Sequence, residues 1–206
     1  MSAIQDKNNI LGKIKTDSGL MLELGCGESK KNNDAIAIDL IDFPGVDIVG
    51  DIYEVLQQIP SGSISYIYSS HVFEHLDNLP EILIELHRVL QREGELDIIV
   101  PHFSNSFFYS DPTHNSFFGL YTFSYYFNDK IFSRSVPKYA LIDGMQLFDV
   151  KLIFRSYRPR YLSHGVRKIF QFIFNCTTFM QEMYEESFVN FVSCYEIRFK
   201  AKKIES

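Results

Sequence analysis

The sequence has no tryptophan, only three cysteines and no long apolar run. Cys26, Cys176 and Cys194 are odd in number and include no CxxC pair, which argues against a disulfide framework and against a thiolate zinc site. No stretch approaches the roughly 18 apolar residues of a membrane span, and the N-terminus lacks the apolar core of a signal peptide. We therefore expect a cytoplasmic protein with reduced cysteines.

Basic residues are fewer than acidic ones, and the first half of the chain has few aromatic residues. The 20 Lys+Arg and 26 Asp+Glu residues give a net charge of −6, which argues against binding of nucleic acid. Residues 1–100 hold 5 of the 31 Phe and Tyr residues, and they carry 7 basic and 17 acidic side chains. Residues 101–206 hold the other 26 aromatics, with 13 basic and 9 acidic side chains. We expect one domain over residues 1–206 whose two halves have different tasks.

Short apolar runs bounded by Gly, Pro or acidic residues predict strands that are buried on both faces. These runs are residues 20–25, 35–40, 46–50, 64–70 and 95–100. Apolar residues at three- and four-residue spacing over residues 79–90 predict a helix. Asn78 and Glu81 form a capping box at its start, and Gly94 is the predicted C-terminal stop. Strands that alternate with crossovers predict a parallel α/β sheet.

After the fifth predicted strand the sequence becomes aromatic and polar, with no clean period. We predict that residues 103–144 form a lid or substrate-binding insertion. Residues 158–187 form a second elaboration, which contains a predicted helix over about residues 166–186. Residues 145–157 and 188–203 alternate well enough to be strands.

The most informative stretch is Glu23-Leu24-Gly25-Cys26-Gly27, directly after the first predicted strand. Glycines let the backbone turn sharply and approach a ligand closely. Asp39 ends the next strand, where a carboxylate can accept both hydroxyl hydrogens of a ribose. Together they indicate an adenosine-containing cofactor at the switch point of an open sheet.

A dinucleotide fits this stretch poorly. Its fingerprint needs a third glycine and a helix whose N-terminus meets the pyrophosphate. Lys30 stands at the third-glycine position, and the residues between Gly27 and Asp39 leave room for hardly a turn of helix. A cofactor with an amino-acid tail on its adenosine is therefore favoured.

With these motifs the sequence resembles the class I S-adenosylmethionine-dependent methyltransferases, specifically the methyltransferase type 11 branch. ELGCG resembles the first motif of that family, and Asp39 its ribose-binding acid. Gly50-Asp51-Ile52 resembles the segment beside the adenine, and ISYIYSSHVFEHL and RVLQREGELDIIVPH resemble the fourth-strand and fifth-strand motifs. The resemblance covers about residues 20–102. It implies a Rossmann-like α/β fold with a mostly parallel sheet and an antiparallel C-terminal strand, and S-adenosylmethionine as cofactor.

The resemblance also implies a set of cofactor-binding residues at the ends of the predicted strands. They are Glu23, Gly25, Cys26 and Gly27 around the methionine moiety, Asp39 and Leu40 at the ribose, Asp51 and Ile52 at the adenine, and Ser69, Ser70 and His71 at the sulfonium end. Several of these residues also fit a purely structural role. The glycines could form an ordinary strand-end turn, Cys26 could be a small loop filler, and Asp39 or Asp51 could cap the next element.

The string His71-Val72-Phe73-Glu74-His75 matches H-x-x-E-H, a zinc-peptidase signature in which both histidines bind metal and the glutamate activates water. That chemistry needs a regular helix and a distant third ligand. Here the string begins at the end of a buried strand, and Pro80 follows soon after it. In the family that the sequence resembles, the same string forms a strand-to-helix corner, so we predict no metal site.

Methyl transfer is an in-line displacement at carbon, and it needs a base when the acceptor is a hydroxyl. His102 follows the fifth predicted strand, at the edge where active-site groups gather. In Asp111-Pro112-Thr113-His114, Asp111 could orient His114 as the base. His71 is a further candidate. The alternative for the Asp111–His114 string is a turn with an Asx-type cap and a surface histidine.

The same string and the aromatic run after it resemble type 11 members associated with polysaccharide and lipopolysaccharide assembly. This resemblance implies a sugar hydroxyl in a glycan or glycolipid as the methyl acceptor. Alternatives are methylation of a small molecule or a protein, and cofactor binding without catalysis.

A basic run without acids follows, at residues 151–168. It contains Lys151, Arg155, Arg158, Arg160, Arg167 and Lys168. A solvated basic face is one interpretation of this run. Another is a surface for a phosphate-bearing glycan or an anionic lipid head group, with peripheral membrane association aided by the apolar residues 169–174. We expect a monomer or a homodimer.

Overall fold

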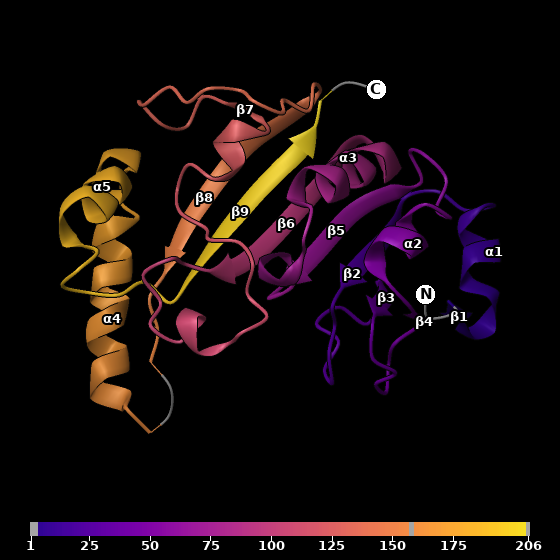
Figure 1. The fold of residues 1–206 in the computed structure, drawn as a ribbon, viewed down its shortest axis with the longest axis horizontal. Coiled ribbons are helices and arrows are strands. Elements are labelled where there is room, and N and C mark those ends of the chain that lie inside the picture. Colours follow the sequence, from indigo (N-terminus) through magenta and orange to yellow (C-terminus); the bar gives the residue numbers. More distant parts are fainter. Residues whose placement is uncertain (1–3, 157–158, 205–206) are drawn as a thin grey trace.

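The computed structural model describes residues 4–156 and 159–204, and one continuous sheet runs through it in the order β1-β4-β3-β2-β5-β6-β9-β8-β7 (Figure 1). Its strands are β1 (Gln5–Asp6), β2 (Leu20–Leu24), β3 (Ile36–Asp39), β4 (Ile48–Val49), β5 (Ile64–Ser70), β6 (Leu90–Pro101), β7 (Asn128–Asp129), β8 (Met145–Ile153) and β9 (Glu196–Lys203). The helices are α1 (Ile10–Ile14), α2 (Ile52–Leu56), α3 (Leu79–Val89), α4 (Tyr161–Phe174) and α5 (Thr178–Met183).

The pairing of the strands confirms the expected Rossmann-like α/β architecture. Strands β2 to β6 are parallel to one another where they pair, whereas β9 is antiparallel to both β6 and β8. From β2 the chain moves outward through β3 and β4, and it then returns to place β5 and β6 on the other side of β2. The switch point, where such sheets bind their ligands, therefore lies at the carboxyl ends of β2 and β5.

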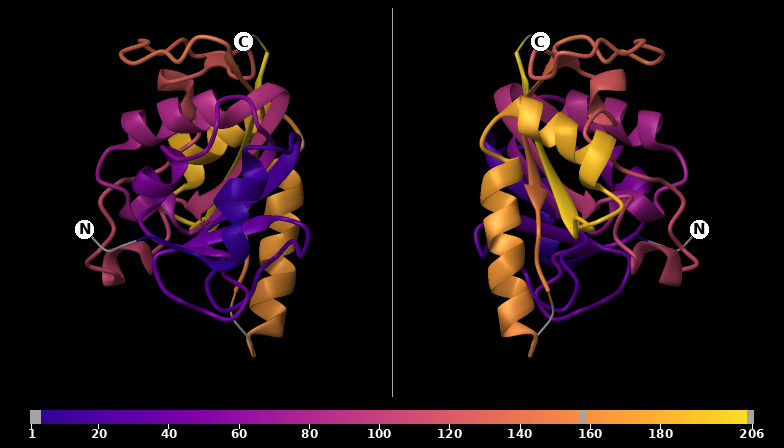
Figure 2. Two further views of the ribbon diagram at one scale, coloured as in Figure 1. Left: turned by 90° about the vertical axis from the view of Figure 1, so that its right-hand side faces the viewer. Right: turned by 90° about the vertical axis from the view of Figure 1, so that its left-hand side faces the viewer.

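One face of the central strands is fully buried. Leu22, Ile38, Ile67 and Ile98 are all nearly inaccessible to solvent. Figure 2 shows α3 on one side of the sheet and α4 on the other. The opposite face is more polar and less buried, since Tyr66 and Tyr68 of β5 lie on it and are half-buried.

The helix predicted over residues 79–90 is confirmed, but its end differs. Asn78 caps it by accepting from the Glu81 amide (3.4 Å), and its side-chain amide donates to the Glu81 carboxylate (2.9 Å). The helix ends at Val89, and Leu90 is already extended and pairs with Ile64. Gly94 lies inside β6 and does not stop the helix, because this buried pairing ends the helix earlier.

The predicted helix over residues 166–186 is split into α4 and α5. Asn175 ends α4, because its side chain accepts from the Leu152 amide (2.9 Å) and donates to the Leu152 carbonyl (2.8 Å) on β8. Thr177 then caps α5 through the Met180 amide (3.2 Å). The strand predicted over residues 188–203 is also shorter, since β9 begins only at Glu196.

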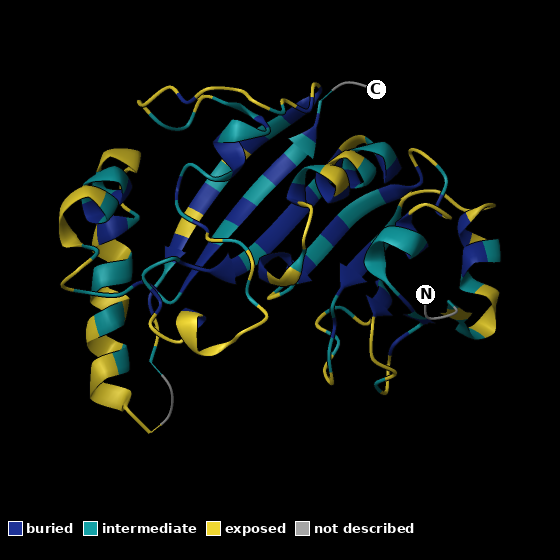
Figure 3. Ribbon diagram, in the orientation of Figure 1, coloured by how far each residue is buried: buried dark blue, intermediate teal, exposed yellow. Residues whose placement is uncertain are grey.

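Helix α4 is exposed along most of its length (Figure 3). Leu162, Ile169 and Phe172 are among its exposed apolar side chains, and Phe174 is its buried one. Within residues 4–156 and 159–204, neither α4 nor any other helix is long and apolar enough to cross a membrane.

Replacing Asn78 with Ala should lower the free energy of unfolding by about 1 kcal/mol, because the first turn of α3 loses its capping acceptor. Urea denaturation followed by circular dichroism measures this change. The matched control is Asn190→Ala at an exposed position, for which we expect a change within about 0.5 kcal/mol. Equal values for the two variants would contradict the capping role.

Candidate active site

The turn after β2 is built for a glycine at its first position. Gly25 and Gly27 have φ angles of 68° and 57°, in the left-handed region that favours glycine. A Cβ atom on Gly25 would lie 2.1 Å from Cγ2 of Val72, which follows β5. The backbone of this turn thus packs directly against the segment that leaves the neighbouring strand.

Asp39 lies at the end of β3 and joins the loops around it. Its carboxylate accepts from the Gly27 amide (2.8 Å) and from the Ile41 amide (2.9 Å). A carboxylate has about four acceptor positions, so these two bonds leave capacity for further donors. The adjacent Leu40 is 65% exposed and offers an apolar surface beside the carboxylate.

Glu23 organises the short connection between β2 and β3. Its buried carboxylate accepts from the backbone amides of Lys31 (2.9 Å) and Asn32 (3.0 Å). In the described part of the chain no helix lies between these strands, as the short spacing predicts. Burial, with help from the charges of Asp39 and Glu23, raises the pKa of Cys26 to about 11. A neutral thiol of this kind suits a loop filler and is a poor nucleophile.

The remaining predicted cofactor residues lie around this turn. Asp51 caps α2 by accepting from the amides of Tyr53 (2.8 Å) and Glu54 (3.4 Å), as the capping alternative expects. Ile52 is the first residue of α2. The Gly50 amide donates to the Asp39 carbonyl (2.9 Å), so the segments predicted at the adenine and at the ribose are neighbours.

Two serines end β5. Ser69 is buried and donates to the Leu24 carbonyl (3.3 Å), whereas Ser70 is half-buried. The predicted sulfonium end thus lies beside the end of β2.

His71 directly follows β5 and lies between two buried carboxylates. Its Nδ1 is 3.2 Å from Glu74 Oε1, and its Nε2 is 2.7 Å from Glu196 Oε1. Burial by itself would lower the pKa of His71, but the hydrogen bonds to Glu196 and Glu74 outweigh it and raise the pKa to about 9. At neutral pH the ring is a cation that donates to both carboxylates, which leaves it no lone pair with which to act as a base.

Glu196 connects His71 to the second half of the chain. It is the first residue of β9, and it forms an ion pair with Arg155, which follows β8. The Arg155 guanidinium carbon lies 4.4 Å from the centre of the Tyr195 ring, a cation–π contact. We call His71, Glu74, Glu196, Arg155 and Tyr195 the carboxyl-edge cluster.

A pocket of about 130 Å³ opens beside this cluster. It is lined by Asn105, Ser106, Phe107, Arg155, Ser156, Arg160, Arg167, Ser193 and Tyr195. These residues follow β6, follow β8 or precede β9, so the topology gathers them at the carboxyl edge of the sheet. Three guanidinium groups around one small pocket favour an anionic ligand. Arg158 of the basic run lies outside the described residues.

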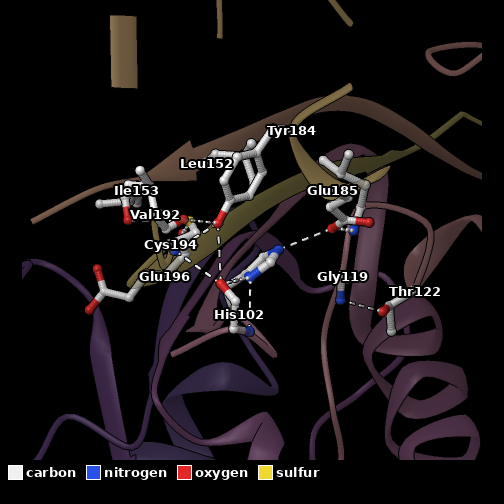
Figure 4. A network of polar contacts seen from close by, with 12 residues as sticks. His102, Gly119, Thr122, Leu152, Ile153, Tyr184, Glu185, Val192, Cys194 and Glu196 are labelled. Carbon is white, nitrogen blue, oxygen red and sulfur yellow. Dashed lines mark hydrogen bonds and ion pairs between the residues drawn. The ribbon is translucent and has the colours of Figure 1, made fainter. Parts of the chain in front are cut away.

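His102 is buried in a polar network that leaves it no free nitrogen (Figure 4). Its Nδ1 is 2.8 Å from Ser104 Oγ, and its Nε2 is 3.0 Å from Glu185 Oε1. Glu185 also accepts from the Leu120 amide (2.7 Å), and Ser104 Oγ lies 3.2 Å from the Tyr184 hydroxyl. The network ties residues 103–144 to the segment after α5. This burial suits a structural role for His102 and not the predicted role of base.

The Asp111–His114 string forms a turn. Asp111 Oδ1 accepts from the Thr113 amide (2.9 Å) and from its hydroxyl (2.6 Å), and these bonds lower the pKa of Asp111. His114 Nδ1 donates to the Phe108 carbonyl (2.8 Å), while its Nε2 is 3.8 Å from Asp111 Oδ2, too far for a hydrogen bond. Asp111 therefore orients Thr113 and does not orient His114, which is the arrangement of the Asx-turn alternative.

The H-x-x-E-H string does not form a peptidase site. Residues Phe73–His75 are a short 3-10 turn and not part of a regular helix. His71 binds Glu196, whereas His75 Nδ1 lies 2.8 Å from Thr113 Oγ1. The two histidines of the motif thus contact different partners.

Two residues of the carboxyl-edge cluster have no local signal in the sequence. Glu196 and Tyr195 follow His71 by more than 120 positions, and the start of β9 places Glu196 beside His71. From the sequence, Glu74 is predicted to be a carboxylate at the start of a helix, where the helix dipole favours a negative charge. The only sequence feature that points to Arg155 is its place in the basic run at residues 151–168.

Comparison with known proteins agrees with this fold. Residues 28–98 match the family model described as a methyltransferase domain. A SAM-dependent methyltransferase from Archaeoglobus fulgidus is 17% identical, with 94% of this chain and 93% of that chain covered and a TM-score of 0.57. The YcgJ protein from Bacillus subtilis is 15% identical, with 95% and 98% covered and a TM-score of 0.50.

Phosphoethanolamine N-methyltransferase 2 from Haemonchus contortus is 13% identical, with a TM-score of 0.52. It is aligned over 97% of this chain, which spans only 53% of the nematode chain. No curated protein sequence matches the chain.

The sheet order and the glycine turn after β2, with the matching domain, define a class I methyltransferase fold. The chain is an S-adenosylmethionine-dependent methyltransferase, and S-adenosylmethionine is its cofactor.

The raised pKa of His71 predicts a pH-dependent contribution to stability. The pKa is higher in the folded protein than the value of about 6.5 in an unfolded chain. Binding of the proton therefore stabilises the fold fully below about pH 6.5, and this contribution is lost as the pH rises through about 9. We expect the difference in unfolding free energy between the wild type and His71→Asn to shrink over this interval. Urea denaturation at a series of pH values tests this, and a constant difference would contradict it.

Proposed function

We propose that the enzyme transfers the methyl group of S-adenosylmethionine to a sugar hydroxyl in a phosphate-bearing glycan or glycolipid. The observation that carries this proposal is the arginine-lined pocket at the carboxyl edge of the sheet. Guanidinium groups bind phosphate oxygens through paired hydrogen bonds, and an acceptor held there lies beside the strand ends that face the cofactor.

The strand ends fit the cofactor. S-adenosylmethionine supplies a methyl group that is activated on a sulfonium. Gly25 and Gly27 would let the backbone approach its methionine moiety, and Asp39 would accept the ribose hydroxyls with its remaining lone pairs. The exposed Leu40 would pack against the adenosine. Ser70 and His71, at the end of β5, would line the sulfonium side.

The arginine-lined pocket is held in shape before any ligand binds. Arg155 is fixed by its ion pair with Glu196 and by the ring of Tyr195. Arg167 donates to the Ser193 carbonyl (2.6 Å), while Arg160 precedes α4 and is exposed. A preorganised set of charged donors loses less side-chain entropy when it binds a phosphate.

Exposed aromatic rings in the 103–144 segment, which contributes to this pocket, support a sugar as the acceptor. Phe107, Tyr109 and Phe117 are all more than half exposed, and Phe107 lines the pocket. Large apolar side chains are normally buried, so their exposure at a binding edge favours contact with a ligand. The apolar faces of sugar rings stack well on such rings.

Incubation with isotopically labelled S-adenosylmethionine tests the reaction. Fractions of phosphate-bearing glycans and glycolipids should gain the label and the mass of one CH₂ group per methylation. Cofactor binding without transfer to any such fraction would contradict the proposal, as would transfer confined to proteins.

Replacing Asp39 with Ala should weaken binding of S-adenosylmethionine by at least about 10-fold, because hydrogen bonds that involve a charged group contribute about 1.5–3 kcal/mol. Asp39→Asn should weaken it less, since one acceptor oxygen remains. Isothermal titration calorimetry measures the dissociation constants. The matched control is Asp42→Ala, an exposed carboxylate on the same loop that pairs with Lys7. Wild-type affinity in Asp39→Ala would rule out the ribose assignment.

Replacing Arg160 with Gln should raise KM for a phosphate-bearing acceptor by about 10-fold or more, with little change in kcat, since the lost contact is made before the transfer step. After phosphatase treatment of the acceptor, the wild type and the variant should have the same KM. Lys168→Gln on α4 is the control, because Lys168 donates to Gln171 and lies outside the pocket. Equal KM values for Arg160→Gln and the wild type on the intact acceptor would remove phosphate from the proposal.

A further inference from the structure

We propose that Glu74, His75 and His114 bind a divalent transition-metal ion of the Zn²⁺ type. One carboxylate oxygen of Glu74 and one ring nitrogen of each histidine lie within 4.8 Å of one another. The centres of the two imidazole rings are 4.8 Å apart. Two imidazoles and one carboxylate are a ligand set that suits Zn²⁺ and leaves coordination positions open.

Hydrogen bonding decides which nitrogen of His75 is free. The Thr113 hydroxyl donates its proton to Asp111 Oδ1 (2.6 Å), so it can only accept from His75 Nδ1 (2.8 Å). His75 therefore carries its proton on Nδ1 and keeps a lone pair on Nε2. A histidine whose other nitrogen is held by a chain of this kind is typical of metal ligands.

The same reasoning applies to His114. Its Nδ1 faces the Phe108 carbonyl oxygen (2.8 Å), which can only accept, so the proton is on Nδ1. The lone pair on Nε2 has no hydrogen-bond donor within residues 4–156 and 159–204. A histidine that donates from Nδ1 to a backbone carbonyl is likewise oriented as metal ligands are.

Glu74 supplies a second, independent observation. Its side chain is fully buried, and Oε1 accepts from His71 Nδ1 (3.2 Å). Oε2 is buried as well and has no hydrogen-bond partner among the described residues. A buried carboxylate oxygen without a donor is costly, and a bound cation would remove this cost.

The proposed site joins two parts of the chain that the backbone already holds together. Glu74 and His75 lie in the turn after β5, whereas His114 lies in the 103–144 segment. The Asn115 amide donates to the Glu74 carbonyl (2.7 Å). A metal ion here would fix this segment over the carboxyl edge of the sheet. Because His71 is not a ligand and His114 is, the site differs from the H-x-x-E-H set.

Titration of the untagged full chain with Co²⁺ tests the site, because the visible absorption of Co²⁺ reports nitrogen and oxygen ligands. We expect one equivalent to bind, Zn²⁺ to displace it, and Zn²⁺ to raise Tm. Glu74→Gln and His114→Gln should each lower Co²⁺ affinity by at least about 10-fold. Thr113→Val keeps all three ligands but removes the partner of His75 Nδ1, and it should lower the affinity by about 10-fold.

The matched control is His164→Gln, a histidine on α4 that should leave Co²⁺ affinity unchanged. Far-UV circular dichroism checks that each variant is folded. If Glu74→Gln does not fold, the Co²⁺ affinities of His114→Gln and Thr113→Val test the site. The absence of saturable Co²⁺ binding to the wild type would overturn the proposal, as would equal affinity in the wild type and His114→Gln.

Discussion

The contact between His71 and Glu196 joins the two halves of this chain at the carboxyl edge of the parallel strands. His71 directly follows β5, and Glu196 begins β9, which is inserted antiparallel between β6 and β8. The charge on His71 is stabilised by two buried carboxylates, and Glu196 in turn holds Arg155. One charged cluster therefore links the end of β5 to the arginine-lined pocket, and β9 supplies Glu196 to it.

The long aromatic segment has two physical roles. Most of its rings pack: Phe118, Phe123 and Phe127 are buried and contact one another, and Phe123 also contacts Phe199 of β9. Phe107, Tyr109, Phe117 and Tyr139 remain exposed, and Phe107 lines the pocket. The polar network around His102 ties this segment to the residues after α5, so a segment without long helices or strands is nevertheless held in place. The uneven distribution of aromatics is thus mainly a consequence of core packing.

Local signals predicted much of this structure. The five apolar runs became strands, and the Asn78 cap began α3, because strand burial and helix capping depend on residues close in sequence. The break between α4 and α5 was missed, since it depends on a contact between Asn175 and Leu152 on β8. The prediction that Gly94 stops the helix was wrong for a similar reason, because the pairing of Leu90 with Ile64 ends the helix before the glycine.

The sequence by itself determined the class of fold and the cofactor, because the glycine turn and Asp39 lie at the ends of consecutive strands and form a pattern of short spacings. The roles of the histidines were decided only by the tertiary structure. From the sequence, His71, His102 and His114 are equally good candidates for a base. In the structure His71 is a cation between two carboxylates, and His102 is buried with both nitrogens in hydrogen bonds. His114 keeps a lone pair and lies beside Glu74 and His75. The protonation of an imidazole depends on the groups that fold around it, and most of those groups come from distant strands and loops.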